Sequence, residues 1–296
     1  MALQTKVIKQ KIASVGNVQK VTKTMELISV AKMRKAVTRK RNAAQYGQYI
    51  LEILVRLSAQ RHLTHELFTA RSAGTRILVL MTSDRGLCGQ FHARIDRRVR
   101  QFLDNHEGQP VVCVVVGSHA MKIAKRYKLP VIYETKGQTE TLTVGDMHEL
   151  TAFLIDAYTK DETYHSVSCI FNQFENAMAY APTRSKILPL NDELLTEVFE
   201  ADRIALVEHS KEHVYTLEPS EEEVLAEVLP ELLALTLHKF LMHSSASEHS
   251  ARMVAMRRAS DNALRLKQKL VRDYNRARQE AVTKEIIEIV SAAEAL

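Results

Sequence analysis

The sequence predicts an α/β protein: a long antiparallel coiled coil of its N- and C-terminal helices, plus a small α/β domain between them. Two observations predict this architecture. Residues 1–60 and 220–296 repeat their apolar side chains at three- and four-residue steps, as amphipathic helices do. The middle of the chain instead alternates short apolar runs with helical stretches, which is typical of a layered domain with a largely parallel sheet.

Residues 1–60 predict a single long helix. The segment contains no proline and only two glycines, Gly16 and Gly47. Its apolar stripe is too narrow for a globular core and suits a coiled-coil seam. A helix of about 55 residues is about 80 Å long, so it must pack along a second long helix. The stripe consists of Ile8, Ile12, Val15, Val18, Val21, Met25 and Ile28, and resumes at Ile50, Leu54 and Leu57.

Residues 220–296 predict the second helix. Ser220, with Glu223 three positions later, reads as a capping box, and the helical pattern runs to about Val290. Pro230 is expected to kink or divide the first turns. Small residues in the stripe let two helix axes approach closely, which favours an antiparallel pair over two independent surface helices. The stripe consists of Met253, Met256, Ala263, Leu270, Tyr274, Ala277 and Ala281.

Residues 74–190 predict the α/β domain, and residues 191–219 predict an acidic connecting segment. No helical stretch separates the last two apolar runs, so an antiparallel edge strand is expected. The expected strands are Arg76–Thr82, Val111–Val116, Val131–Tyr133, Val167–Phe171 and Lys186–Leu188. The expected helices between them are Gln90–Asn105, His119–Tyr127 and Asp146–Thr159.

Composition excludes several classes of protein. The 46% hydrophobic and 26% charged content is that of a chain that folds. No apolar run reaches the ~18 residues of a membrane span, and the N-terminus lacks the apolar core of a secretory signal. Cys88, Cys113 and Cys169 are widely spaced with no CxxC pair, so neither a disulfide framework nor a zinc site is indicated. The chain reads as cytosolic.

Charge is distributed unevenly along the chain. Residues 1–60 hold 12 Lys and Arg against two acids, and residues 249–278 hold nine against two. Residues 190–232 instead carry 13 acids against two bases. Basic ends can clasp nucleic acid, but aromatic side chains for base stacking are scarce there. A basic helix pair surrounded by acidic surfaces of other proteins would explain the same charges as well as nucleic-acid binding does.

The segment Thr82–Gln90 lies where a phosphate-binding turn would lie, after the first strand and before a helix. Neither the GxGxxG nor the GxxxxGK[ST] spacing is present, so no nucleotide is expected there. Gly86 and Gly89 are interpreted as glycines of a tight turn.

Two other groups of residues are candidates for chemistry. Cys88 is a candidate nucleophile with His92 as its base and Arg85 nearby, but no acid is placed to orient His92, and a small packed residue is the alternative. The spacings of the remaining histidines supply no set of metal ligands, so we interpret them as surface or packing residues. These histidines are His62, His65, His238, His243 and His249.

Four motifs in the chain resemble one known family. The run Ile12–Lys35 (IASVGNVQKVTKTMELISVAKMRK) closely resembles the start of the gamma subunit of F-type ATP synthases. Ser83–Gly89 is similar to the glycine turn of that family, and Ala246–Ala263 and Tyr274–Val290 resemble its C-terminal signature. The motifs lie in family order, so the resemblance covers the whole chain.

The resemblance implies a central-stalk rotor subunit with a Rossmann-like α/β domain at its base. Such a subunit transmits torque between the c-ring and the alpha–beta catalytic hexamer of a proton- or sodium-translocating ATP synthase, and so regulates ATPase activity and ion flow. The implied partners are the alpha, beta and epsilon subunits and the c-ring, without nucleic acid, cofactor or metal. The chain itself would be non-catalytic, and held at the cytoplasmic face of a bacterial membrane only through the complex.

The resemblance also implies which residues meet the beta subunits. Met25 corresponds to a loop contact, and Arg278 with Gln279 corresponds to a polar pair that engages a beta loop near the top of the shaft. Arg252 and Glu285 match positions implicated in coupling, with plain helix-surface residues as the alternative. The basic ends would face acidic beta loops, and the acidic stretch would face the c-ring at the foot.

The chain departs from the family pattern at three places. Gln90-Phe91-His92 replaces the more usual Gly-Leu-Asn, which is expected to alter local packing. Ile287 stands where threonine is frequent, so one hydrogen bond near the shaft tip is in doubt. The redox-regulated cysteine insertion of chloroplast gamma subunits is missing, so thiol control is not expected. The absence of a transit peptide favours a bacterial source.

Overall fold

The computed structural model describes residues 2–60, 65–135, 137–161, 163–190, 218 and 220–294. The chain divides into two compact units. The first unit consists of residues 1–31 and 252–296, and the second consists of residues 32–251. Apart from Glu218, the predicted acidic segment lies outside the described residues.

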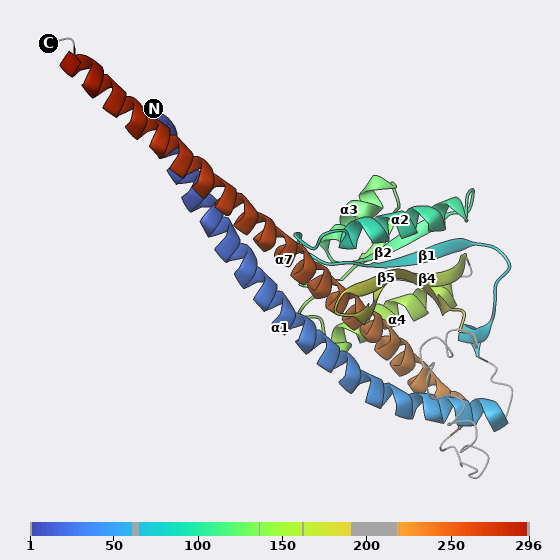
Figure 1. The fold of residues 1–296 in the computed structure, drawn as a ribbon. Helices are drawn as coiled ribbons and strands as arrows, with labels where there is room; N and C mark the ends of the chain where they lie inside the picture. The colour runs from blue at the N-terminus through green and yellow to red at the C-terminus, as the bar shows by residue number, and fades with distance from the viewer. Residues whose placement is uncertain are drawn as a thin grey trace. The chain divides into compact units, whose positions relative to one another are not determined.

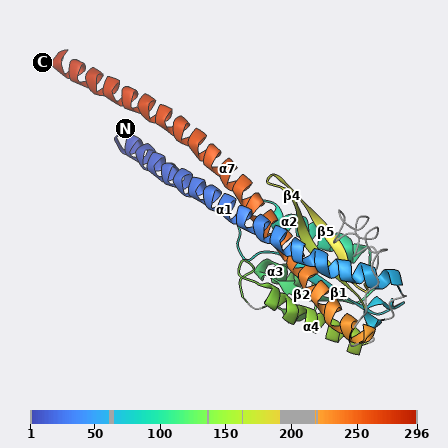
Figure 2. The ribbon, with the colours of Figure 1, turned by 90° about the horizontal axis from the view of Figure 1, so that it is seen from below.

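Two long helices, α1 (Ala2–Gln60) and α7 (Glu221–Glu294), contribute to both units. Within the first unit, the N-terminal part of α1 and the C-terminal part of α7 lie side by side and run in opposite directions (Figures 1 and 2). Gly16 of α1 lies against Lys267 of α7, because a Cβ at Gly16 would be 3.8 Å from Nζ of Lys267. The predicted antiparallel coiled coil is therefore confirmed.

The buried side of α1 differs from the predicted apolar stripe. In the first unit its buried residues are small or polar: Gly16, Thr22, Glu26 and Ser29. Val18, Val21 and Ile28, which we expected in the seam, are 51%, 57% and 50% exposed. The predicted stripe was therefore wrong at these three positions, whereas its members Ile8, Ile12, Val15 and Met25 are half-buried.

Small residues suit this position because they allow two helices to approach closely. Their polar atoms need no partner across the seam. Oγ1 of Thr22 donates to the carbonyl oxygen of Val18 at 2.9 Å, and Oγ of Ser29 donates to that of Met25 at 2.7 Å. On the matching part of α7, Ser260 is buried, Met256 and Ala263 of the predicted stripe are buried, and the other five residues of that stripe are half-buried.

Replacing Gly16 by alanine is expected to stabilise the protein by about 1 kcal/mol, because glycine in a helix interior is that much less favourable than alanine. The new methyl group would meet Lys267 at an ordinary contact distance. Thermal unfolding followed by circular dichroism measures the change. Asn17→Ala, at an exposed neighbour, should gain less. A lower midpoint for Gly16→Ala would show that the helices are packed too closely for a methyl group.

The second unit contains a five-stranded sheet in the order β3-β2-β1-β4-β5. The strands are β1 (Thr75–Met81), β2 (Val111–Val116), β3 (Val131–Glu134), β4 (Tyr164–Asn176) and β5 (Ala179–Leu188). The first four are parallel and β5 pairs antiparallel with β4, which confirms the predicted parallel sheet with an antiparallel edge. Strands β4 and β5 are longer than predicted, because apolar runs mark only their buried halves.

Helices cover both faces of the sheet (Figure 1). Helices α2 (Phe91–Asp104) and α3 (Ser118–Arg126) pack on one face, and α4 (Val144–Lys160) packs on the other with the N-terminal part of α7. Alternate residues of β1 point into the two cores: Ile77 and Val79 into one, Leu78 and Leu80 into the other. This alternation follows from the two-residue period of a strand.

Helix α7 begins as predicted. Oγ of Ser220 accepts the backbone N–H of Glu223 at 3.3 Å, which caps the first turn. Pro230 was expected to kink or divide the first turns, and it lies inside one continuous helix, so it does not divide the helix. Within the described residues, every helix is too short or too polar to cross a membrane.

Candidate functional site

The turn after β1 is built around the carboxylate of Asp84. Oδ1 accepts the backbone N–H of Ser118 at 2.8 Å, and Oδ2 accepts the backbone N–H and the hydroxyl of Thr139 at 2.8 and 3.0 Å. Ser118 is the first residue of α3, so the carboxylate lies at the positive end of that helix. Burial acts to raise the pKa of Asp84, but the hydrogen bonds from Thr139 and Ser118 hold it below its ordinary value.

A phosphate at this turn would need the N–H groups that Asp84 already occupies, and it would be repelled by the carboxylate. The backbone also packs tightly here. Gly117 has a φ of 92°, and a Cβ at this position would lie 3.0 Å from the carbonyl oxygen of Thr82. We therefore interpret the turn as an internal connection between β1, α3 and the loop that carries Thr139, rather than as a nucleotide site.

The candidate nucleophile Cys88 and its candidate base His92 are both engaged with the turn itself. Sγ of Cys88 lies 3.8 Å from the carbonyl oxygen of Arg85, and the residue is only 2% exposed. Nε2 of His92 lies 3.3 Å from the same oxygen and 3.4 Å from Oγ of Ser83. Its ring lies against that of His119 at a tilt of 32°, with 3.7 Å between centroids. These contacts indicate a packing role for both side chains.

All three cysteines are buried in the second unit. Cys113 and Cys169 have no exposed surface, and burial raises the pKa of Cys113 to about 12. The unusual Phe91 is also completely buried in the core beside Cys88. The departure from the family pattern at this position therefore lies within the core.

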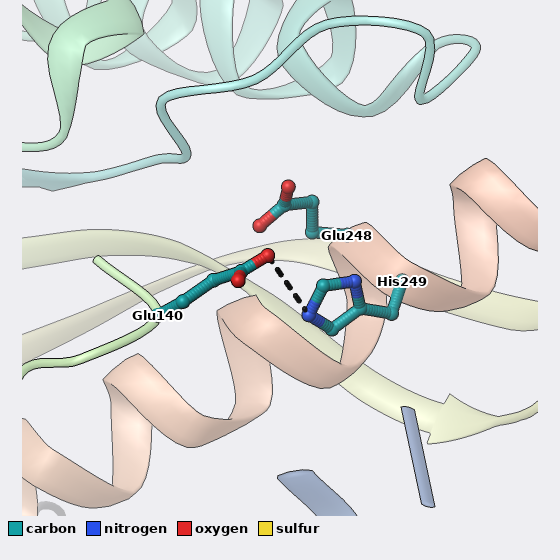
Figure 3. Close-up of side chains that lie close together, drawn as sticks. All are labelled: Glu140, Glu248 and His249. Carbon is teal, nitrogen blue, oxygen red and sulfur yellow. Dashed lines mark ion pairs between the residues drawn. The ribbon is translucent and has the colours of Figure 1, made fainter. Parts of the chain in front are cut away.

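A cluster of charged side chains in the second unit was not predicted from the sequence. It consists of Glu140, in the loop between β3 and α4, and Glu248 and His249 of α7 (Figure 3). One oxygen or nitrogen atom of each lies within 4.8 Å of the others. Glu248 and His249 are each 3% exposed, and Nε2 of His249 lies 3.7 Å from Oε1 of Glu140.

The cluster has the ligand types of a divalent-metal site, but one of its two carboxylates, that of Glu140, is already paired with a cation. Nζ of Lys32 lies 2.6 Å from Oε2 of Glu140. The ammonium group supplies the positive charge that the carboxylate requires, and it would repel a metal ion at the same oxygen. We therefore interpret the cluster as an ion-pair network.

Two of the remaining histidines, His238 and His243, are buried on α7, with 8% and 6% exposure. Nδ1 of His243 accepts the backbone N–H of Phe174 in β4 at 3.2 Å. Burial, reinforced by two nearby lysines, lowers the pKa of His243 to about 3. Both are packing residues, as predicted. His65 accepts a backbone N–H in the short helix η1 (Glu66–Phe68), and His62 lies outside the described residues.

The residues implied as beta contacts are spread along the first unit and do not form one site. Met25 is half-buried on α1, Arg252 is 7% exposed, and Arg278 and Gln279 are exposed. Along α7, positions 252 and 278 are about 39 Å apart at 1.5 Å per residue. Glu285 belongs to α7, but its side chain is outside the described part.

Large apolar side chains are exposed along both helices of the first unit. We call this set the rod surface. Many exposed large apolar side chains along one part of a molecule are typical of a region that another protein covers. On α1 it consists of Val7, Val18, Val21, Leu27 and Ile28, and on α7 of Leu264, Leu266, Val271, Val282, Ile286, Ile287, Ile289 and Val290.

Comparison with known proteins shows the family. The family model described as ATP synthase matches residues 4–296. The ATP synthase gamma chain of Heliobacterium modesticaldum is 34% identical over 290 residues, which cover 98% of both chains. The chain belongs to the ATP synthase gamma chain family. The gamma chain of Cupriavidus metallidurans is also 34% identical, over 99% of both chains. The family predicted from the four motifs is confirmed.

Solved structures share the fold of this gamma chain. A chain of the Euglena gracilis mitochondrial ATP synthase matches with a TM-score of 0.67 and 17% identity over 100% of this chain and 95% of its own length. A chain from the central stalk and c-ring of the Tetrahymena thermophila enzyme matches with a TM-score of 0.57 and 23% identity over 81% of this chain and 99% of its own. At these identities the likeness concerns the fold alone.

Proposed function

We propose that this gamma chain is the central-stalk rotor subunit of an F-type ATP synthase and transmits torque between the c-ring and the alpha–beta hexamer. The observation that carries the proposal is the rod surface. A helix pair that leaves many large apolar side chains exposed is suited to being enclosed by other subunits. The similar Tetrahymena chain comes from a central stalk and c-ring, which supports the same role.

The mechanism follows from the unequal faces of the rod. Beta subunits around it would meet different sets of apolar and basic side chains, so each would be held in a different conformation. Rotation, driven by proton or sodium flow, would pass each set of contacts to the next subunit. This role requires no catalytic residue, and we propose that the chain is non-catalytic. The epsilon subunit and the c-ring are the other proposed partners. The chain would be held at the cytoplasmic face of a bacterial membrane only by its contacts with these subunits.

Co-purification tests the proposal. Tagged gamma chain, co-expressed with alpha and beta subunits, is expected to elute with both as one complex during gel filtration. Elution of gamma alone would contradict the rotor role. Calorimetry with ATP or NAD tests the alternative of a nucleotide-dependent enzyme, and saturable binding by the isolated chain would favour it. DNA binding that survives competition by alpha–beta complexes would favour a nucleic-acid protein.

Arg278→Ala is expected to weaken ATP synthesis or assembly roughly tenfold, the effect of losing one hydrogen bond to a charged group. Arg278 is exposed, so the helicity of the isolated chain should not change. Arg276→Ala is the matched control, because Nε of Arg276 pairs with Glu280 of its own helix at 2.9 Å. Unaltered synthesis and hydrolysis in the assembled Arg278→Ala enzyme would contradict the contact.

A further inference from the structure

The two long helices are attached to the α/β layers by different kinds of contact. Helix α7 is part of the hydrophobic core through residues such as Leu233 and Leu237, and Phe240 stacks on Phe171 of β4 with 4.2 Å between ring centroids. Among the residues that the structure describes, neither core cluster includes a residue of α1. Met33 and Ala36 of α1 are buried in this unit but belong to neither core cluster, so polar contacts add to apolar packing in holding this part of α1.

Glu140 provides these polar contacts. Its Oε2 pairs with Nζ of Lys32 at 2.6 Å, and its backbone oxygen accepts a hydrogen bond from Arg39 at 3.5 Å, so it contacts α1 at positions two turns apart. Its Oε1 lies 3.7 Å from Nε2 of His249 on α7 (Figure 3). One loop residue thus contacts both long helices.

Glu140 is ionised at neutral pH. Burial acts to raise the pKa of Glu140, but the hydrogen bond and charge of Lys32, followed by the charges of His249 and Arg85, hold it below its ordinary value. The side chain of Glu140 is 23% exposed and that of Lys32 is 36% exposed, so the pair is partly shielded from water. Charge-assisted hydrogen bonds of this kind are shorter and stronger than neutral ones.

We propose that Glu140 is the residue that fixes α1 to the α/β layers, and that force passes from these layers to α1 through its pair with Lys32. The inference rests on the proposed rotor function and names a residue through which that rotor would carry load. The directional ion pair adds resistance to displacement along the helix axis beyond that of the apolar packing of Met33 and Ala36. The contact with His249 would keep α1 and α7 in a common register.

Hydrogen exchange on the full-length isolated chain tests the attachment without reference to function. Glu140→Gln keeps the shape of the side chain and removes its charge, and is expected to accelerate amide exchange in residues 32–41 about tenfold. Amides of residues 236–246, which belong to the core, should keep their protection. Lys32→Met should accelerate exchange in residues 32–41 as Glu140→Gln does, and the double variant should add little there, because both changes remove the pair of Lys32 with Glu140. Lys35→Met, at an exposed position one turn along α1, is the control.

The assembled enzyme in vesicles tests whether the attachment carries load. Glu140→Gln is expected to hydrolyse ATP while pumping at least about twofold fewer ions per ATP, because α1 would slip relative to the layers. Faster exchange with full pumping would overturn the mechanical role, and unchanged exchange would overturn the attachment itself. A saturable rise in melting temperature with Zn²⁺, lost in Glu140→Gln, would instead assign the cluster to a metal. If the unmodified chain failed to assemble with the alpha and beta subunits, the rotor function would be rejected. The hydrogen-exchange result on the attachment of α1 would still hold.

Discussion

Lowering the pH from 7 to 4 is expected to remove about 3 kcal/mol of folding free energy through His243 alone. The imidazole is 6% exposed, and the folded protein keeps it neutral down to a pKa of about 3. In the unfolded chain the same group titrates near 6.5. Because the folded pKa is lowered, this stability is fully present above pH 6.5 and is lost as the pH falls towards 3.

Urea unfolding at several values between pH 7 and pH 4 measures the effect. Asparagine at position 243 retains an oxygen that can accept the N–H of Phe174, but it does not titrate. His243→Asn should therefore lose less stability with falling pH than the unmodified protein, even if it is less stable at pH 7. Other groups titrate in both proteins, so the difference between their slopes isolates His243. Equal slopes would show that the buried imidazole is protonated without unfolding.

Asp84→Ala is expected to destabilise the α/β domain by about 3 kcal/mol, because it removes three hydrogen bonds to a charged acceptor. Two of the donors are the backbone N–H groups of Ser118 and Thr139. In the variant these groups would have lost their acceptor in the protein and could bond only to water. Asp84→Asn should be intermediate, since one of its two terminal atoms still accepts a hydrogen bond.

Chemical denaturation measures the loss, and Asp104→Ala is the control. The carboxylate of Asp104 is 69% exposed and lies 3.9 Å from Arg100, so its removal should cost less than about 0.5 kcal/mol. Inorganic phosphate should raise the melting temperature of Asp84→Ala and leave that of the unmodified protein unchanged, because only the variant exposes the positive end of α3. Equal losses in the two alanine variants would contradict the role given to Asp84.

The elements of the α/β domain were predictable because each buries its apolar side within a single unit. Strand β2 has the bounds that its apolar run predicts, Val111–Val116. In β4, only the buried half was recognised, since the exposed half that pairs with β5 carries no apolar pattern. Two-residue and 3.6-residue periods therefore locate elements well where one face meets a core and the other meets water.

The seam of the coiled coil was predictable only in part from the same periods. The predicted stripe of α7 is buried or half-buried throughout, but three residues of the predicted α1 stripe are exposed. Helix α1 has one face of small residues, with Gly16 and Ser29, and another of larger apolar residues, with Val18 and Leu27. An isolated pattern favours the larger residues as the seam, whereas close approach of two helices selects the smaller ones. The larger apolar residues then stay exposed on the helix pair, where other proteins can cover them. A single sequence does not show those partner proteins.

The Glu140 cluster could not be predicted for a different reason. Glu140 is in a loop, where no period applies, and it lies 108 residues from Lys32 along the chain. Only the folded sheet and helices bring such residues together. The histidine that joins them, His249, looked like one of several packing residues because its spacing to the other histidines suggested nothing.

The buried cysteines have a practical consequence for studying rotation. Cys88, Cys113 and Cys169 are at most 2% exposed, so a maleimide reagent should not reach them in the folded protein. A cysteine introduced on the exposed part of α7 would then be labelled selectively, with the native residues left in place. A fluorophore or gold bead attached there would report the angular position of the helix pair while the enzyme turns over.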